Sequence, residues 1–134
     1  MQNPPPGYTR VCPYLMYEDA AAAVEYLTTT FGFVKRLEET GAAGRPHREL
    51  VLGEDEDALV MLGQAGESFK SPKTLDAYPS VLVHLYVDDV EALHERANAA
   101  GADVSDLETS PAGDLRFSAT DPEGQVWVFA QRVA

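Results

Sequence analysis

Two segments of this 134-residue chain follow the same order of residue types and lie about half the chain apart. An apolar run ending at Tyr17 precedes Asp19 and an alanine-rich segment, and a second apolar run, Val81–Val87, precedes Asp89 and another helix-like segment. Aligning the two aspartates gives an offset of 89 − 19 = 70 residues. A period of this length indicates two copies of one folding unit, which constrains the fold more than any single motif.

The second half of each copy repeats as well. Leu50–Leu62 and Phe117–Phe129 each show a strand, an acidic turn and a strand, at an offset of 129 − 62 = 67 residues. The sequence therefore predicts an α+β fold of two βαβββ units, joined by a linker in which Gly, Ser and Pro interrupt the periodicity. Two units of this size would each be marginal alone, so we predict that they fuse into one domain. The predicted ranges are about 10–62 for the first unit, 63–80 for the linker and 81–132 for the second unit, within a single domain of residues 1–134.

Local signals place the elements of the first unit. Asp19 fits the N-cap of a helix over Ala20–Thr30, and Gly32 fits its C-terminal end. The strand before this helix is predicted at Arg10–Tyr17, and Pro13 favours an edge position for it because proline cannot donate to the ladder. Three further strands are predicted at about 33–38, 47–52 and 58–62.

The second unit carries the same signals. Asp88 or Asp89 fits the N-cap of a helix over Val90–Ala100, which Gly101 ends. Asp121–Gly124 has Asp, Pro and Gly at the positions that a type I turn favours, so it predicts a hairpin. We expect inward-facing side chains at Leu93, Ala97, Ala100, Trp127 and Phe129, a solvated His94, and strands at about 103–108, 115–119 and 126–131.

Charge and composition exclude some partners. The net charge of −12 leaves no basic patch for nucleic acid, and no apolar run approaches the roughly 18 residues of a membrane span. The acidic surface favours either a cationic small molecule or solubility alone. Cys12 is the only cysteine, so no disulfide framework exists, and the N-terminus lacks the features of a signal peptide. We expect a cytoplasmic protein.

Three segments in order resemble the glyoxalase/bleomycin-resistance/dioxygenase superfamily, also called vicinal oxygen chelate proteins. They are the PYL-x₃-DA start at Pro13–Ala20, HLYVDDVEAL at His84–Leu93 and the closing DPEGQVWVFAQ at Asp121–Gln131. The resemblance covers about residues 10–132. It implies two curved four-stranded mixed sheets with helices on the convex side and a ligand cleft on the concave side. It also implies a homodimer in which both subunits form each cleft.

Metal-dependent members of this family hold a divalent ion with four His, Gln or Glu side chains, from the first and last strand of each unit. The resemblance places Cys12, Met61, Leu82 and Val128 at those positions. Hard divalent ions need oxygen or imidazole ligands, so we expect no metal and no other cofactor. His follows the DP-x-G turn in many relatives, whereas this chain has Gln125.

Two other chemistries remain open. His47 and Glu49 share one face of a strand, and with His84 they form a conceivable alternative metal site. The favoured interpretation is that His47 lies at the exposed start of its strand and that His84 hydrogen-bonds within the cleft. Cys12 is the obvious nucleophile to consider, but activation needs a cationic neighbour and none lies nearby in sequence. We therefore predict no catalytic residues, and a small apolar role for Cys12.

The sequence thus favours a metal-free protein of the bleomycin-resistance type that binds a cationic or aromatic small molecule. The alternatives are a metal-dependent lyase, isomerase or dioxygenase of the same fold, and an interaction domain with an empty cleft. Apolar and aromatic walls with few polar groups are typical of ligand pockets. The predicted ligand-binding residues are Cys12, Tyr14, Met16, Met61, Leu82, His84, Tyr86 and Val128.

Overall fold

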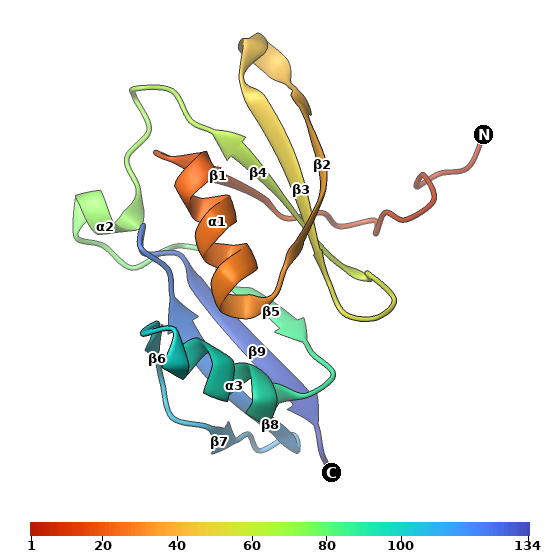
Figure 1. Cartoon of the computed structure of the whole chain (residues 1–134), viewed down its shortest axis with the longest axis vertical. Coiled ribbons are helices and arrows are strands. Elements are labelled where there is room, and N and C mark those ends of the chain that lie inside the picture. The colour runs from red at the N-terminus through yellow and green to blue at the C-terminus, as the bar shows by residue number, and fades with distance from the viewer. The chain divides into compact units, whose positions relative to one another are not determined.

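The computed structural model describes residues 1–134, except for the side chain of Ala42. The chain divides into two compact units, unit 1 (Met1–Phe69) and unit 2 (Lys70–Ala134), and the division lies inside the segment expected to link the repeats. Each unit has one sheet and one long helix (Figure 1). No helix in the described part of the chain is long and apolar enough to cross a membrane.

Unit 1 contains a four-stranded mixed sheet in the order β1-β4-β3-β2. β1 runs parallel to β4, and the other neighbouring pairs are antiparallel. Helix α1 contacts β1, β2 and β4. The elements are β1 (Tyr14–Tyr17), α1 (Ala20–Phe31), β2 (Val34–Thr40), the short 3₁₀ helix η1 (Ala42–Gly44), β3 (Pro46–Leu52) and β4 (Ala58–Gln64).

Unit 2 contains a five-stranded mixed sheet in which β5-β9-β8-β6 form the main path and β7 also pairs with β8. The fifth strand arises because the segment predicted as one weak strand at 103–108 divides into β6 and β7. Helix α3 contacts β6, β8 and β9. The elements are α2 (Pro72–Leu75), β5 (Val83–Tyr86), α3 (Val90–Ala99), β6 (Asp103–Val104), β7 (Glu108–Thr109), β8 (Asp114–Thr120) and β9 (Val126–Arg132).

The strand pairing confirms the predicted repeat. β1 and β5 open the two units, and each pairs in parallel with the last strand of its own unit. Tyr14 lies beside Met61, and His84 lies beside Val128. These pairs are related by 84 − 14 = 70 and 128 − 61 = 67 residues, the same offsets that the sequence repeat shows.

The helix ends repeat as well. Asp19 accepts a hydrogen bond from Ala22 N at 3.1 Å, and Asp89 accepts one from Ala92 N at 3.0 Å, so both predicted N-caps are confirmed. Gly32 ends α1 with a φ of 81°, in the left-handed region that glycine adopts without strain. These local signals fix where each helix begins and ends, independently of the core.

The helix of each unit covers one face of its sheet. Gln64 of β4 accepts from the first amide of α1 at 2.9 Å, and Gln131 of β9 accepts from the first amide of α3 at 3.0 Å. Side chains alternate along a strand, so Met61 and Val128 point to the opposite face of their sheets. We call the face of each sheet that lies opposite its helix the open face.

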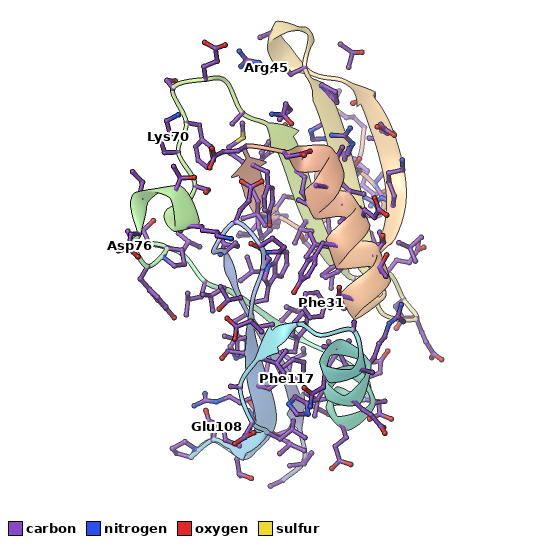
Figure 2. The ribbon with its side chains drawn as sticks, turned by 60° about the vertical axis from the view of Figure 1, so that its left-hand side comes forward. Phe31, Arg45, Lys70, Asp76, Glu108 and Phe117 are labelled. Carbon is purple, nitrogen blue, oxygen red and sulfur yellow. The ribbon has the colours of Figure 1, made fainter. Side chains whose placement is uncertain are left out.

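The helix-covered faces form the cores of the two units. In unit 1, Leu27 and Phe31 of α1 and Leu50 and Leu62 of the sheet are fully buried. In unit 2, Phe117, Trp127 and Phe129 are fully buried, as predicted for the last two. The Phe117 ring lies against α3, 4.8 Å from the His94 ring (Figure 2).

Some element boundaries differ from the predictions. β1 begins at Tyr14 rather than Arg10, because Pro13 has no amide to donate and contributes only its carbonyl, which accepts from Met61 N at 2.8 Å. β5 begins at Val83 rather than Val81. The predicted linker contains the short helix α2, whose N-cap Ser71 accepts from Thr74 N at 3.3 Å.

Two side chains of α3 were placed wrongly by the sequence pattern. Ala100 is exposed because α3 ends at Ala99, and Gly101 then turns the chain away with a φ of 80°. His94 is half-buried rather than solvated, because it lies one turn from Val90 and from Ala97 on the face that meets the sheet. Its Nε2 donates to the carbonyl of Ser105 at 2.8 Å.

Candidate functional site

In unit 1 the open face carries three of the predicted ligand-binding residues. Tyr14 and Met16 of β1 are 50% and 41% exposed, and Met61 beside Tyr14 is half-buried. Large side chains of this kind are more often buried, so their exposure on one face marks a surface able to contact an apolar or aromatic group.

A hydrogen-bonded network connects this exposed surface to a buried carboxylate. The Tyr14 hydroxyl lies 2.8 Å from His47 Nδ1, and His47 Nε2 lies 3.0 Å from Glu49 Oε2. The other oxygen of Glu49 accepts from the Tyr8 hydroxyl at 2.7 Å and from Arg36 at 3.3 Å. We call these five residues the Tyr14 network. Glu49 is only 3% exposed, so the network stabilises a charge that would otherwise be costly to bury.

The pKa of Glu49 is set by opposing effects. Burial raises it, but hydrogen bonds from His47, Tyr8 and Arg36 outweigh burial, and the pKa lies below the usual value for a glutamate. The same carboxylate raises the pKa of Tyr8, chiefly by accepting its hydroxyl proton. Glu49 is therefore ionised at neutral pH, and all of its hydrogen bonds are accepted ones.

Gly63 makes room for the network. Tyr14 is on the edge strand β1, His47 is on β3, and the strand between them, β4, has Gly63 in register with both Met16 and His47. A Cβ atom on Gly63 would lie 2.8 Å from Cε1 of Tyr14 and 3.0 Å from Sδ of Met16. The missing side chain thus lets the Tyr14 ring cross β4 and reach His47.

We expect Gly63→Ala to displace the Tyr14 ring and break its hydrogen bond to His47. The overlap should lower the free energy of unfolding by about 1–2 kcal/mol, as overpacking does elsewhere. Urea denaturation measures the loss, and NMR contacts between the two rings report the displacement. Gly66→Ala is the matched control, because its Cβ would meet only the flexible Arg45 guanidinium. Equal stability of the two variants would contradict this account of Gly63.

The open face of unit 2 carries a second buried carboxylate beside an exposed tyrosine. Tyr86 is 57% exposed and donates its hydroxyl proton to Asp114 Oδ2 at 2.9 Å. Arg132 donates to the other oxygen of Asp114. The ring of His84 lies 5.5 Å from that of Tyr86, with Val128 beside His84 in the ladder. Tyr86 and Tyr14 thus occupy comparable surroundings in the two units.

The pKa of Asp114 lies below the usual aspartate value, mainly because Arg132 donates a hydrogen bond to it and despite its partial burial. The pKa of Arg132 is raised for the same reason. A carboxyl whose folded-state pKa is depressed stabilises the native state above its unfolded-state pKa, about 3.9 for aspartate, and this stabilisation is lost as pH falls through the folded-state value.

We therefore expect acidification below about pH 4 to lower the free energy of unfolding, in part through Asp114. Asp114→Asn should lower stability at neutral pH and reduce the dependence on pH in this acidic window. Denaturant titrations of both proteins from neutral to acid pH measure the difference. An unchanged pH dependence in the variant would show that Asp114 does not contribute.

The predicted ligand-binding residues divide between the units. Tyr14, Met16 and Met61 share the open face of unit 1, and His84, Tyr86 and Val128 share that of unit 2. Cys12 and Leu82 precede their strands. Cys12 is half-buried rather than buried, and its thiol donates to the carbonyl of Thr9 at 3.0 Å.

Several residues of these networks were not anticipated from the sequence. Arg36, Tyr8, Asp114 and Arg132 show no local signal, since each reaches its partner across strands or from the N-terminal segment. Gly63 gave none either, because the sequence does not show which strands flank it. Two signals for a buried, paired carboxylate were available: Glu49 directly precedes the apolar run Leu50–Leu52, and it shares a strand face with His47.

The side chains at the family's metal positions do not fit a hard divalent ion. Of the four positions, Cys12 and Leu82 precede their strands, and Met61 and Val128 carry no oxygen or nitrogen in their side chains. The strand neighbours of Met61 and Val128 are Tyr14 and His84, so each of these pairs offers at most one oxygen or nitrogen donor. Among the described residues, no group of three His, Cys, Asp or Glu gathers closely enough to hold a metal ion. The nitrogens of His47 are already bonded to Tyr14 and Glu49.

The family model of the glyoxalase/bleomycin resistance protein/dioxygenase superfamily matches residues 9–129. The chain belongs to this superfamily. An uncharacterised protein of Mycobacterium bovis, Mb0911c, is 34% identical over 128 residues, which cover 90% of this chain and 82% of the relative.

Two solved structures share the fold of this chain. TioX from Micromonospora sp. ML1 has a TM-score of 0.68 at 28% identity, covering 94% of this chain and all of TioX. TnmS3, described as an antibiotic-binding protein from Streptomyces sp. CB03234, has a TM-score of 0.68 at 22% identity with the same coverage.

Proposed function

We propose that this superfamily member binds a small molecule on the open faces of its sheets and releases it unchanged, without a metal ion. The observation that carries the proposal is the exposure of the large side chains of Tyr14, Met16 and Tyr86 on these faces. Apolar and aromatic walls with few polar groups suit ligand binding. The predicted contacts are Cys12, Tyr14, Met16, Met61, Leu82, His84, Tyr86 and Val128.

The ligand class proposed is a cationic or aromatic compound. The net charge of −12 attracts cations over the whole surface, and the exposed tyrosines offer ring faces to aromatic groups or to cations. The antibiotic-binding description of TnmS3 supports a small-molecule ligand. We further propose a homodimer in the cytoplasm, with no nucleic-acid or membrane partner.

A thermal-shift screen tests the proposal. The purified protein is melted with cationic antibiotics, aromatic metabolites and α-oxo thiol adducts, each at a concentration well above its expected Kd. A ligand present at 100 times its Kd stabilises the native state by about 2.7 kcal/mol, which raises the Tm by several degrees. Compounds that raise the Tm are then recovered and weighed by mass spectrometry. Recovery of a changed compound would favour the lyase, isomerase or dioxygenase alternative.

Removal of metal should have no effect. On the open faces, Met61 lies beside Tyr14 and Val128 lies beside His84, so each pair offers a metal ion one oxygen or nitrogen ligand. Elemental analysis should therefore find no stoichiometric divalent metal in the purified protein. Dialysis against EDTA should leave the Tm unchanged. A stoichiometric metal whose removal lowers the Tm would overturn the metal-free proposal.

Size-exclusion chromatography with light scattering on the same samples tests the proposed homodimer.

A further inference from the structure

The hydroxyl groups of both exposed tyrosines on the open faces donate hydrogen bonds to other residues of the protein. Tyr86 donates directly to Asp114, and Tyr14 reaches Glu49 through His47. Both carboxylates are at least 95% buried. The arrangement therefore occurs twice, once in each unit, although the connecting residues differ.

The direction of the hydrogen bonds in unit 1 follows from the carboxylate. Ionised Glu49 can only accept, so Nε2 of His47 must carry a proton to make its 3.0 Å contact. In the neutral imidazole, Nδ1 is then the unprotonated nitrogen and accepts from the Tyr14 hydroxyl at 2.8 Å. Tyr8 and Arg36 occupy the other oxygen of Glu49, which leaves Oε2 for His47.

The direction in unit 2 is simpler. Arg132 has only donors, and it binds one oxygen of Asp114. The other oxygen, Oδ2, accepts a hydrogen bond from the Tyr86 hydroxyl at 2.9 Å. Each tyrosine hydroxyl has one hydrogen to donate, and that hydrogen already bonds to His47 in unit 1 or to Asp114 in unit 2.

From this geometry we propose that Tyr14 and Tyr86 each present the phenol oxygen, as a hydrogen-bond acceptor only, to a ligand bound on the open face of their own unit. The inference rests on the proposed binding function and specifies its ligand class further. Such anchors select molecules with N–H donors, above all protonated amines attached to an apolar or aromatic body. They discriminate against carboxylates and carbonyl compounds. These molecules would need to accept a hydrogen bond from the tyrosine hydroxyl, which already donates to a partner within the protein. His47 is a positioning residue that holds this direction in unit 1.

The first test needs no ligand. At about pH 8, where imidazole in water is neutral, a long-range ¹H–¹⁵N NMR spectrum shows which ring nitrogen of His47 is protonated. We expect Nε2–H and a bare Nδ1. Glu49→Gln should shift the tautomer balance, because the carboxylate that fixes it is gone. Protonation of Nδ1 in the unaltered protein would contradict the proposal for Tyr14.

The second test uses three probes of one shape: 2-phenylethylamine as a protonated donor, benzylacetone as a neutral acceptor and 3-phenylpropionate as an anionic acceptor. NMR titration measures the Kd of each probe at about pH 8. We expect the amine to bind most tightly. Tyr14→Phe should weaken amine binding on the open face of unit 1 by about tenfold, and Tyr86→Phe should do so on that of unit 2, since a hydrogen bond to a charged group is lost. Neither variant should change benzylacetone binding.

Tyr78→Phe is the matched control, because Tyr78 is 74% exposed and lies outside both open faces. It should leave all three Kd values unchanged, which separates the anchors from the general attraction of an acidic protein for amines. Binding of all probes with no loss in the Tyr14→Phe and Tyr86→Phe variants would overturn the inference and leave the proposed function standing. Failure of every probe to bind the unaltered protein would instead count against the proposed function and the inference together.

Discussion

Trp127→Ala should lower the free energy of unfolding by about 3–5 kcal/mol, a large part of the stability of a small protein. Trp127 of β9 is fully buried and stacks on Phe129 at 6.5 Å between ring centroids. Its indole N–H donates to Asp121 Oδ2 at 3.2 Å. The alanine variant therefore leaves a cavity and removes a partner of a buried carboxylate. Urea denaturation followed by circular dichroism measures the change.

Trp127→Phe serves as the control for this prediction. It keeps an aromatic ring in the core but removes the indole N–H, so we expect a smaller loss of about 1–2 kcal/mol. Alanine and phenylalanine variants of similar stability would mean that the hydrogen bond to Asp121, rather than the packing of the ring, dominates at this position.

Glu49→Ala should cost about 2–3 kcal/mol and disorder the Tyr14 network. The substitution leaves Arg36, Tyr8 and His47 without their common acceptor, and removing one partner of a buried ion pair is expensive. The loss of stability is smaller than for a fully buried pair, because the Arg36 side chain is 24% exposed and can turn toward water. Urea denaturation at neutral pH measures the loss.

Glu38→Ala is the matched comparison, because Glu38 also makes two ion pairs, with Lys35 and Arg48, but on an exposed strand. Exposed pairs contribute little to stability, so we expect almost no change in the unfolding midpoint. A loss at Glu38 equal to that at Glu49 would contradict the view that burial makes the Glu49 network important.

The sequence predicted those parts of the fold that local chemistry determines. Asp19 and Asp89 announce helix starts because a carboxylate satisfies free amides in the next turn, and no distant residue is needed. The Asp121–Gly124 turn formed for the same reason: Gly124 N donates to Asp121 O at 2.9 Å. The repeat then gave the order of elements in both units, which the strand pairing confirms.

The candidate site was predictable only in part. Alternation placed Tyr14 with Met16 and His84 with Tyr86, because side chains two apart on a strand share a face. It could not show that Tyr14 crosses β4 to reach His47, since that contact depends on register and on the missing side chain of Gly63. The pairing of Tyr86 with Asp114 likewise joins residues 28 positions apart.

We propose that the open faces hold a small molecule without a metal and without changing it. The decisive experiment is calorimetric titration of the strongest compound from the thermal-shift screen onto EDTA-dialysed protein, followed by mass spectrometry of the recovered compound. We predict the same Kd before and after dialysis and a compound of unchanged mass. Binding that disappears with EDTA and returns with a divalent ion, or a compound recovered with a new mass, would contradict the claim.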